Sequence, residues 1–416
     1  MTADDVTASA TGGSVEMAFR EVYGHAVATL TRVFGDISLA EDAVQDAFAI
    51  AATRWERDDI PANPAGWVVT TARNRAIDQL RRDTRGQELI RTGINGLGTD
   101  DVHIGAVDDD RLRVMFTCCH PALRVEHQVA LTLRLLGGPS VGEIGHAFLV
   151  GEAAMAKRLV RAKFKIRAAN IPYRVPEQID LPLRVRSVLA VLYLIYTTGA
   201  DEPVERAGLR AEAIRLSRLL TTLMPAEPEA AGLLGLMLLN DSCMPARRTG
   251  DRLVLLRVQD RSRWDQALIA EGHDLVRACI RRAQPGPFQL QAAIQAVHCH
   301  APSFETTEWP QIVALYDHLY DLAPSPVIAL SRAIARAETG RIESALAEID
   351  GLGTGLEMYA PFHAARATLL RKLDRDHDAC DAFRRAASLA TSSADRDHFL
   401  RQIAATGDCH VARFVL

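Results

Sequence analysis

The segment from Ser140 to Arg167, SVGEIGHAFLVGEAAMAKRLVRAKFKIR, constrains the fold more than any other part of the chain. Its first half spaces apolar residues three and four positions apart, which predicts a short amphipathic helix. The pattern stops at Leu149-Val150-Gly151, where we expect a tight turn with Gly151 in backbone angles that favour glycine. The second half predicts a helix that is strongly basic, with one acid, Glu152, against Lys157, Arg158, Arg161, Lys163, Lys165 and Arg167.

A helix-turn-helix whose second helix is basic is suited to the major groove of DNA, where cations reach phosphates and base edges. The alternative for this stretch alone is an ordinary helical hairpin with a solvated basic face. The charge is concentrated here, because the whole chain has 48 basic residues and a net charge of -4. Only four of the basic residues are lysines, and three of these lie in the basic helix. Charge placement, and not net charge, therefore points to nucleic acid.

Length and composition describe a globular protein of several domains. The chain has 416 residues, 48% hydrophobic and 24% charged, so two to four domains are expected. No run approaches the roughly 18 apolar residues that span a bilayer, and the polar start MTADDVTASATGGS does not resemble a signal peptide. The odd number of cysteines, seven, predicts reduced thiols. We therefore expect a cytoplasmic protein without membrane contact.

Helical periodicity extends over almost the whole chain, which predicts an all-α fold. Residues 1–14 read as a disordered tail, and residues 15–85 as a first helical domain. Ser38 and Glu41 have the spacing of a capping box before the second helix, and a third helix is expected over about 65–82. Two amphipathic stripes precede that third helix: Val22, Tyr23, Ala26, Val27, Leu30, Val33 and Phe34, then Leu39, Ala43, Val44, Ala47, Phe48 and Ala51.

Residues 86–109 differ in kind, since glycines and acids predominate there, and we expect an acidic flexible linker. A second helical domain spans 110–170 and ends in the helix-turn-helix. A proline-containing boundary at 171–176 leads into a helical extension over 177–416.

An internal repeat of 34 residues lies near the end of the extension. Ala333, Gly340, Ala345 and Ile349 recur as Ala367, Asp374, Ala379 and Phe383. Small, turn, small and bulky residues at this period are the tetratricopeptide pattern, in which small residues let paired helices pack closely. The extension is therefore expected to be TPR-like.

The third helix of the first domain carries polar groups suited to nucleic acid. Trp67 at its start offers a stacking surface for an unpaired base, although burial in the core is the more common role of a single tryptophan. The hydrogen-bond donors of this helix are Arg73, Asn74, Arg75, Arg81 and Arg82.

These segments in this order resemble the extracytoplasmic-function (ECF) sigma factors of bacterial RNA polymerase. The resemblance rests on LAEDAVQDAFAIAATRW (Leu39–Trp55), NPAGWVVTTARNRAIDQLRR (Asn63–Arg82) and the helix-turn-helix. The first two are similar to sigma region 2, and residues 110–170 are similar to sigma region 4. The extension resembles that of an ECF group with a TPR-like C-terminal domain.

The resemblance implies partners and roles. Asp42, Gln45 and Asp46 would dock on the clamp helices of the largest polymerase subunit, and region 4 on the flap. The helix at 67–82 would contact the melted −10 element, and the acidic linker would run through the RNA exit path. In the basic helix the residues assigned to the −35 element or its neighbourhood are Glu152, Lys157, Arg158, Arg161 and Lys163.

The sequence gives little support for a metal site or a catalytic site. Cys118-Cys119-His120 and His298-Cys299-His300 lack the spacing of a tetrahedral zinc site, so buried structural thiols are favoured. Glu143 and His146 do not form an HExxH motif. We predict no catalytic residues, no metal and no cofactor.

Two functional classes remain. The first is a promoter-specificity subunit whose C-terminal extension regulates it in cis and has a protein partner. The second is a helical-repeat interaction protein whose sigma-like half tethers it to DNA or polymerase without initiating transcription.

Overall fold

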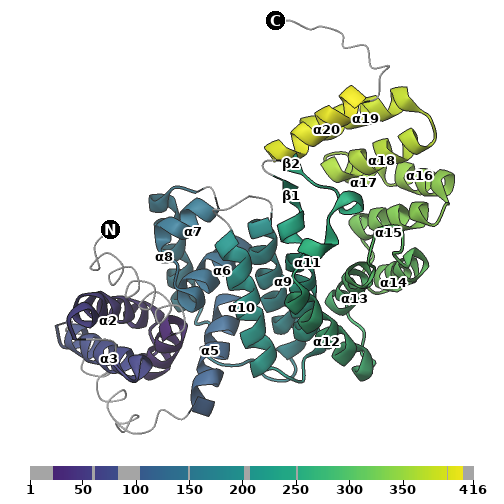
Figure 1. Cartoon of the computed structure of the whole chain (residues 1–416). Coiled ribbons are helices and arrows are strands. Elements are labelled where there is room, and N and C mark those ends of the chain that lie inside the picture. The colour runs from purple at the N-terminus through teal and green to yellow at the C-terminus, as the bar shows by residue number, and fades with distance from the viewer. Residues whose placement is uncertain are drawn as a thin grey trace, which may run out of the picture. The chain divides into compact units, whose positions relative to one another are not determined.

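The computed structural model describes residues 22–58, 61–82, 104–148, 150–200, 207–249, 252–390 and 392–405. The predicted all-α fold class is confirmed (Figure 1). The described strands are two residues long: β1 (Arg248–Thr249) pairs antiparallel with β2 (Arg252–Leu253). The chain divides into two compact units, Met1–Leu223 and Met224–Leu416.

Unit 1 is built from helices that bury one apolar face each. The first described helix covers residues 22–34, and Gly35 follows it with a left-handed φ of 67°. α2 and α3 then pack against each other (Figure 1). The further elements of unit 1 follow in chain order, with η1 a π-helical segment: α2 (Ile37–Asp58), α3 (Pro64–Arg82), α5 (Ile104–Cys118), α6 (Val125–Thr132), η1 (Leu133–Gly137), α7 (Val141–Ala147), α8 (Glu152–Ala168), α9 (Leu181–Ala200) and α10 (Ala207–Leu223).

The start of α2 differs from the predicted capping box. Asp36 Oδ1 accepts hydrogen bonds from the Ser38 and Leu39 backbone N–H groups, at 2.8 and 3.3 Å. Glu41 is instead buried and paired with cations that are distant in the sequence. The Ser38–Glu41 prediction was wrong because these tertiary ion pairs hold the glutamate.

The boundaries of the second predicted helical domain, residues 110–170, also differ from the expectation. α5 begins at Ile104, inside the stretch predicted as linker, and residues 83–103 lie outside the described residues, as does the predicted tail. α9 and α10 belong to unit 1, although the sequence counted them with the extension. Arg215 Nη2 donates to the Leu136 carbonyl at 2.7 Å, and Arg184 donates to the Phe116 carbonyl. Helices after the 171–176 boundary thus pack against the elements of the predicted 110–170 domain.

One described helix segment, Leu181–Thr198 of α9, is long and apolar enough to cross a membrane, with a mean hydropathy of 1.2. In the structure α9 packs against α5, α6 and α10. Its side chains Val188, Leu192 and Ile195 are buried there. Of this segment, 39% is buried, so a core position in unit 1 accounts for part of its apolar composition.

Unit 2 is a succession of paired helices, which Figure 1 shows curving through α11 to α20. Arg332 and Arg336 of α15 both reach Asp317 and Glu348, so an ionic network joins α14, α15 and α16. Besides short 3-10 turns at 244–246, 256–258 and 261–263, the helices are α11 (Pro228–Ser242), α12 (Gln266–Arg282), α13 (Pro287–His300), α14 (Trp309–Leu322), α15 (Pro326–Glu338), α16 (Ile342–Gly351), α17 (Gly353–Leu356), α18 (Ala360–Lys372), α19 (Asp376–Leu389) and α20 (Ser393–Ala405).

The 34-residue repeat corresponds to two helical hairpins, α15–α16 and α18–α19. The turn positions Gly340 and Asp374 both have left-handed backbone angles, with φ of 89° and 56°. The repeated small and bulky positions all lie in one buried cluster: Ala333, Ala345, Ile349, Ala367, Ala379 and Phe383. The repeated sequence pattern therefore matches a repeated packing arrangement.

Candidate polymerase and nucleic-acid interface

The acidic and amide residues of α2 lie on one side of that helix. Asp42 and Asp46 are exposed and Gln45 is half-buried, while Ala43, Val44, Ala47 and Phe48 face the core. Gln45 Nε2 donates to Glu41 Oε1 at 3.0 Å, so its amide is already engaged. Partial burial raises the pKa of Asp42, and the nearby Lys163 opposes that effect.

Beneath this face lies a buried ion-paired carboxylate, Glu41. Its Oε1 accepts a hydrogen bond from Arg134 Nε at 2.6 Å, and its Oε2 lies 2.5 Å from Lys163 Nζ. The side chains of Glu41 and Arg134 are only 5% and 8% exposed. Arg134 also donates to the Pro139 carbonyl at 2.7 Å. Removing one partner of such a buried pair typically costs about 3–5 kcal/mol, because the other charge is left uncompensated.

α3 presents its donors opposite a buried face. Asn74, Arg75, Arg81 and Arg82 are exposed and Arg73 is half-buried. Its buried residues are Val68, Val69, Ala72, Ala76 and Leu80.

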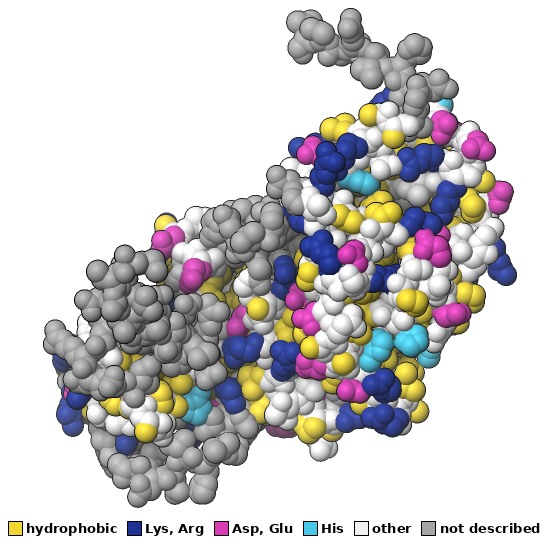
Figure 2. All heavy atoms as spheres, viewed as in Figure 1, with side chains coloured by type: hydrophobic (Ala, Val, Ile, Leu, Met, Phe, Trp, Pro, Cys, Tyr) yellow, Lys and Arg dark blue, Asp and Glu magenta, His cyan; other side chains and the backbone are white. Residues whose placement is uncertain are grey.

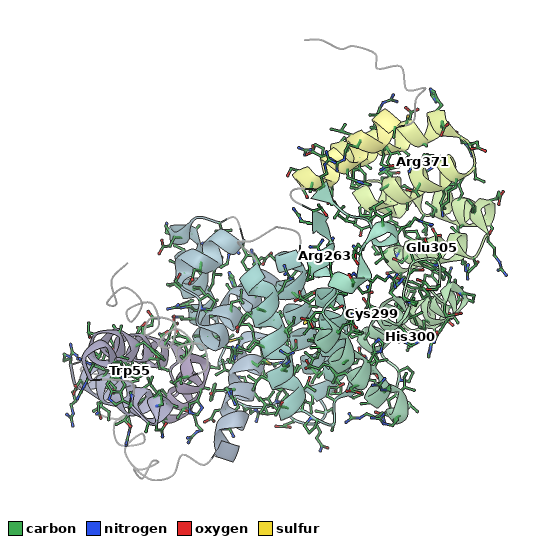
Figure 3. All side chains as sticks on the ribbon, in the orientation of Figure 1. Trp55, Arg263, Cys299, His300, Glu305 and Arg371 are labelled. Atoms are coloured by element: carbon green, nitrogen blue, oxygen red, sulfur yellow. The ribbon has the colours of Figure 1, made fainter. Side chains whose placement is uncertain are left out.

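Trp67 is half-buried, with its ring edge-on to that of Trp55 at a centroid distance of 5.5 Å. Trp55, labelled in Figure 3, is buried. Trp67 therefore combines a core contact with a partly exposed ring, and its stacking role stays a prediction.

α7 and α8 form the helix-turn-helix. Ser140 and Glu143 make a reciprocal capping box at the start of α7, with backbone-to-side-chain distances of 2.6 and 3.1 Å. A Cβ on Gly145 would lie 2.6 Å from the Val150 carbonyl oxygen, so glycine is needed for this close approach. Gly151 has an ordinary φ of -58° and open space around it. The special backbone prediction for Gly151 was wrong, and Gly145 is the residue that the turn requires.

α8 has one buried face and one cationic face. Met155, Leu159, Ala162 and Ile166 are buried. Lys157 and Arg161 are exposed one turn apart, with Glu152 exposed at the helix start and Arg158 half-buried at the side. The apolar side chains Val160 and Phe164 are also exposed, at 66% and 68%. This outer face offers cations and methyl or aromatic groups to a major groove.

Lys163 differs from the other assigned cations of α8. Its side chain is 18% exposed and points its ammonium at Glu41 of α2. Arg167, one turn later, donates to Asp36 Oδ2 at 2.8 Å. These contacts hold α8 to α2 and to Asp36 immediately before it.

Further contacts join the 22–34 helix to later elements of unit 1. Asp110 of α5 is fully buried and pairs with Arg32 at 2.7 Å and with Arg113 at 2.9 Å. The Tyr173 hydroxyl lies 2.8 Å from the Ala28 carbonyl and 3.1 Å from that of Asp110. A Cβ on Gly24 would lie 2.7 Å from the Leu136 carbonyl oxygen, which shows how closely the 22–34 helix approaches η1. We define the closed contact as the set of these contacts together with the Glu41 and Asp36 ion pairs.

Cys118 and Cys119 are buried thiols. Cys118 and Cys119 are free and fully buried, and burial raises the pKa of both, to about 12 for Cys119. Among the described residues, no group of three or more His, Cys, Asp or Glu side chains is placed to hold a metal ion. Cys380 is disulfide-bonded, which differs from the expectation that all thiols are reduced.

Comparison with known families supports the N-terminal assignment. Sigma-70 region 2 matches residues 18–86, which contain the 22–34 helix, α2 and α3. A family of unknown function (DUF6596) matches residues 184–280, from α9 into α12. No solved structure matches the chain.

The chain is thus an all-α protein with a sigma-70 region 2 domain, which supports a sigma-factor-like role in transcription initiation and implies interaction with RNA polymerase core and promoter DNA. An uncharacterized protein of Rhizobium meliloti (strain 1021) is 39% identical over 404 residues, covering 94% of this chain and 95% of that protein. The chain belongs to the family of this protein.

Proposed function

We propose that the protein is a cytoplasmic ECF-type sigma factor, in which α2 binds polymerase, α3 contacts the −10 element and α8 reads the −35 element. The observation that carries the proposal is the coexistence of a region 2 domain with a capped helix-turn-helix. The exposed carboxylates of α2 and the exposed cations of α8 have the charges that a basic polymerase surface and DNA phosphates require.

The closed contact bears on how such a factor would engage a promoter. Elements centred near −10 and −35 are about 25 base pairs apart, or roughly 85 Å along B-DNA. Helices of 17 to 22 residues are only about 25–33 Å long. Because α3 packs on α2 and α8 contacts α2, their outer surfaces cannot reach both elements at once. We propose that initiation requires the closed contact to open.

The helical C-terminal part is proposed to be TPR-like and to regulate the sigma half in cis, with a protein partner of its own. The 34-residue period and the repeated left-handed turns support the TPR-like assignment. Regulation in cis is favoured by the covalent connection, which gives a high effective concentration of one part at the other. α9 and α10, which lead into unit 2, pack around the proposed region 4.

Promoter-specific transcription with purified core polymerase tests the proposal. We expect the full chain to direct initiation from a mapped promoter, and a chain ending at Leu223 to initiate at a rate different from that of the full chain. The cut belongs after Leu223, because a cut after Pro176 would remove α9 and α10 and expose the core of unit 1. Core binding without initiation by either form would favour the alternative, a tethered interaction protein. Equal initiation by both forms would overturn regulation by unit 2.

Gly24→Ala is expected to favour the open arrangement. An added methyl group meets the Leu136 carbonyl oxygen, and such overpacking typically costs about 1–3 kcal/mol. The ratio of closed to open molecules should therefore fall about fivefold or more. Once open, the 22–34 helix gains about 1 kcal/mol from the better helix propensity of alanine. Small-angle scattering of the full chain should show a larger radius of gyration, and initiation should rise.

The matched control is Gly208→Ala in α10, where a new Cβ meets nothing within 4 Å. It should leave both the scattering profile and initiation unchanged. A Gly24→Ala protein with wild-type scattering and wild-type initiation would rule out the closed contact as a barrier.

A further inference from the structure

A half-open cavity of about 790 Å³ lies in unit 2, between α12, α13 and the start of α14. This volume falls within the roughly 300–1,000 Å³ range of small-molecule sites. Its apolar lining includes Val276, Leu290, Val297 and Leu315. Ile280, also in the lining, is 67% exposed, which is unusual for a large aliphatic side chain beside a core.

The polar part of the lining is dominated by imidazoles. His273 of α12, His300 of α13 and His318 of α14 all line the cavity. The His273 and His300 ring centroids are 6.3 Å apart. Figure 2 shows histidine side chains gathered over this part of unit 2, and Figure 3 labels His300 at the C-terminal end of α13.

Few acidic side chains lie near these imidazoles. Burial lowers the pKa of His273, and the neighbouring Arg277 and His300 lower it further, while the Ala296 carbonyl opposes them. The buried Nε2 of His273 has no well-formed hydrogen bond within the described residues. Glu308 is the acid in the lining, and Asp274 is engaged with Arg277 at 2.5 Å. The lining therefore has three imidazoles and Arg277 but a single carboxylate, Glu308, beside an apolar wall, so it is deficient in negative charge.

We infer that this cavity binds a small amphiphilic carboxylate, with its apolar part against Ile280 and Leu290. The carboxylate accepts a hydrogen bond from His300 and favours the protonated form of His273, whose Nε2 then donates to it as well. A carboxylate accepts from several donors at once, and two imidazoles at this separation can both reach one head group. The inference does not depend on the proposed sigma-factor activity, since it concerns binding by unit 2 alone.

Calorimetric titration of the full chain with decanoate, decanol and decylamine tests the inference. Decanoate should bind saturably with one site per chain, at least about tenfold more tightly than decanol, and decylamine should bind more weakly than either. His300→Ala should weaken decanoate binding about tenfold and leave decanol unchanged, because a hydrogen bond to a charged group is lost. His300 is exposed, so this variant is expected to fold.

Two further variants separate the contributions. Ile280→Asn should weaken binding of decanoate and decanol alike, and His377→Ala, at an 89% exposed side chain of α19 outside the cavity, should change neither. Equal binding of all three probes, unaffected by His300→Ala, would overturn the carboxylate assignment, as would no binding. Self-association of the wild type that Ile280→Asn abolishes would assign the cavity to a second copy of the chain instead.

Discussion

Replacing Asp42 and Asp46 by asparagine is expected to lower the affinity for RNA polymerase core by at least about a hundredfold. Each carboxylate can make a charge-assisted hydrogen bond worth about 1.5–3 kcal/mol, and two such losses multiply in the binding constant. Both side chains are exposed, so the free energy of unfolding should change by less than about 0.5 kcal/mol per site. Pull-down or interferometry with purified core measures the affinity, and circular dichroism measures the stability.

Gln45 is left in place in this double variant, because its hydrogen bond to Glu41 belongs to the buried cluster under α2. The matched control is Asp321→Asn with Asp397→Asn, which removes two exposed charges from unit 2. The control should bind core as the wild type does. Wild-type core affinity in the Asp42 and Asp46 variant would remove α2 from the polymerase interface.

Replacing Lys157 and Arg161 by alanine is expected to abolish promoter-specific initiation, with a loss of specific DNA affinity of roughly thirtyfold to ten-thousandfold. Well-placed contacts to base edges are worth about 1–3 kcal/mol each, and these two cations share the exposed face of α8. Neither side chain contributes to the buried face of Met155, Leu159, Ala162 and Ile166, so the fold should be retained. Gel shifts of the full chain across a salt series, with specific and scrambled DNA, measure the effect.

Lys165→Ala is a control on the same helix that removes one positive charge away from Lys157 and Arg161. Lys165 lies in the last turn of α8, where a cation serves phosphate attraction and the helix dipole more than base reading. Its loss should weaken specific and non-specific binding about equally and lower the salt slope by about one unit. If the Lys157 and Arg161 variant likewise weakens specific and non-specific binding equally, with about two units lost from the salt slope, α8 attracts DNA without reading its sequence.

Local patterns predicted most of the helices, because amphipathic spacing and proline or glycine breaks act within a few residues. The repeat at Gly340 and Asp374 was predictable for the same reason, since a left-handed turn recurs where the pattern recurs. The Ser140–Glu143 capping box follows from the same rule that was misapplied to Ser38 and Glu41. At Glu41 the local rule failed because tertiary pairing with a buried arginine outweighs one backbone hydrogen bond.

Long-range pairing could not be predicted from spacing. Glu41 and Arg134 are 93 positions apart, and the residues next to each in the sequence do not indicate that the two side chains pair. Likewise, the sequence assigned Lys163 together with Lys157 by charge alone, although the two lie on different sides of α8. The cavity in unit 2 draws its lining from several elements, so its histidines are scattered in the sequence and only meet in the fold.

Because lysine is scarce in this chain, α8 is distinguished by its primary amines. Apart from Lys372, every lysine of the chain lies in this helix, so a reagent that acylates primary amines addresses the candidate recognition helix almost alone. Within α8, the side chains of Lys157 and Lys165 are exposed to solvent, whereas the amine of Lys163 forms an ion pair with Glu41. The modification rate of Lys163 relative to Lys157 and Lys165 therefore reports the separation of α8 from α2 without any engineered label. Acetylation of that same amine in a cell would remove the charge that Glu41 holds and would connect the acylation state of the chain to the closed contact.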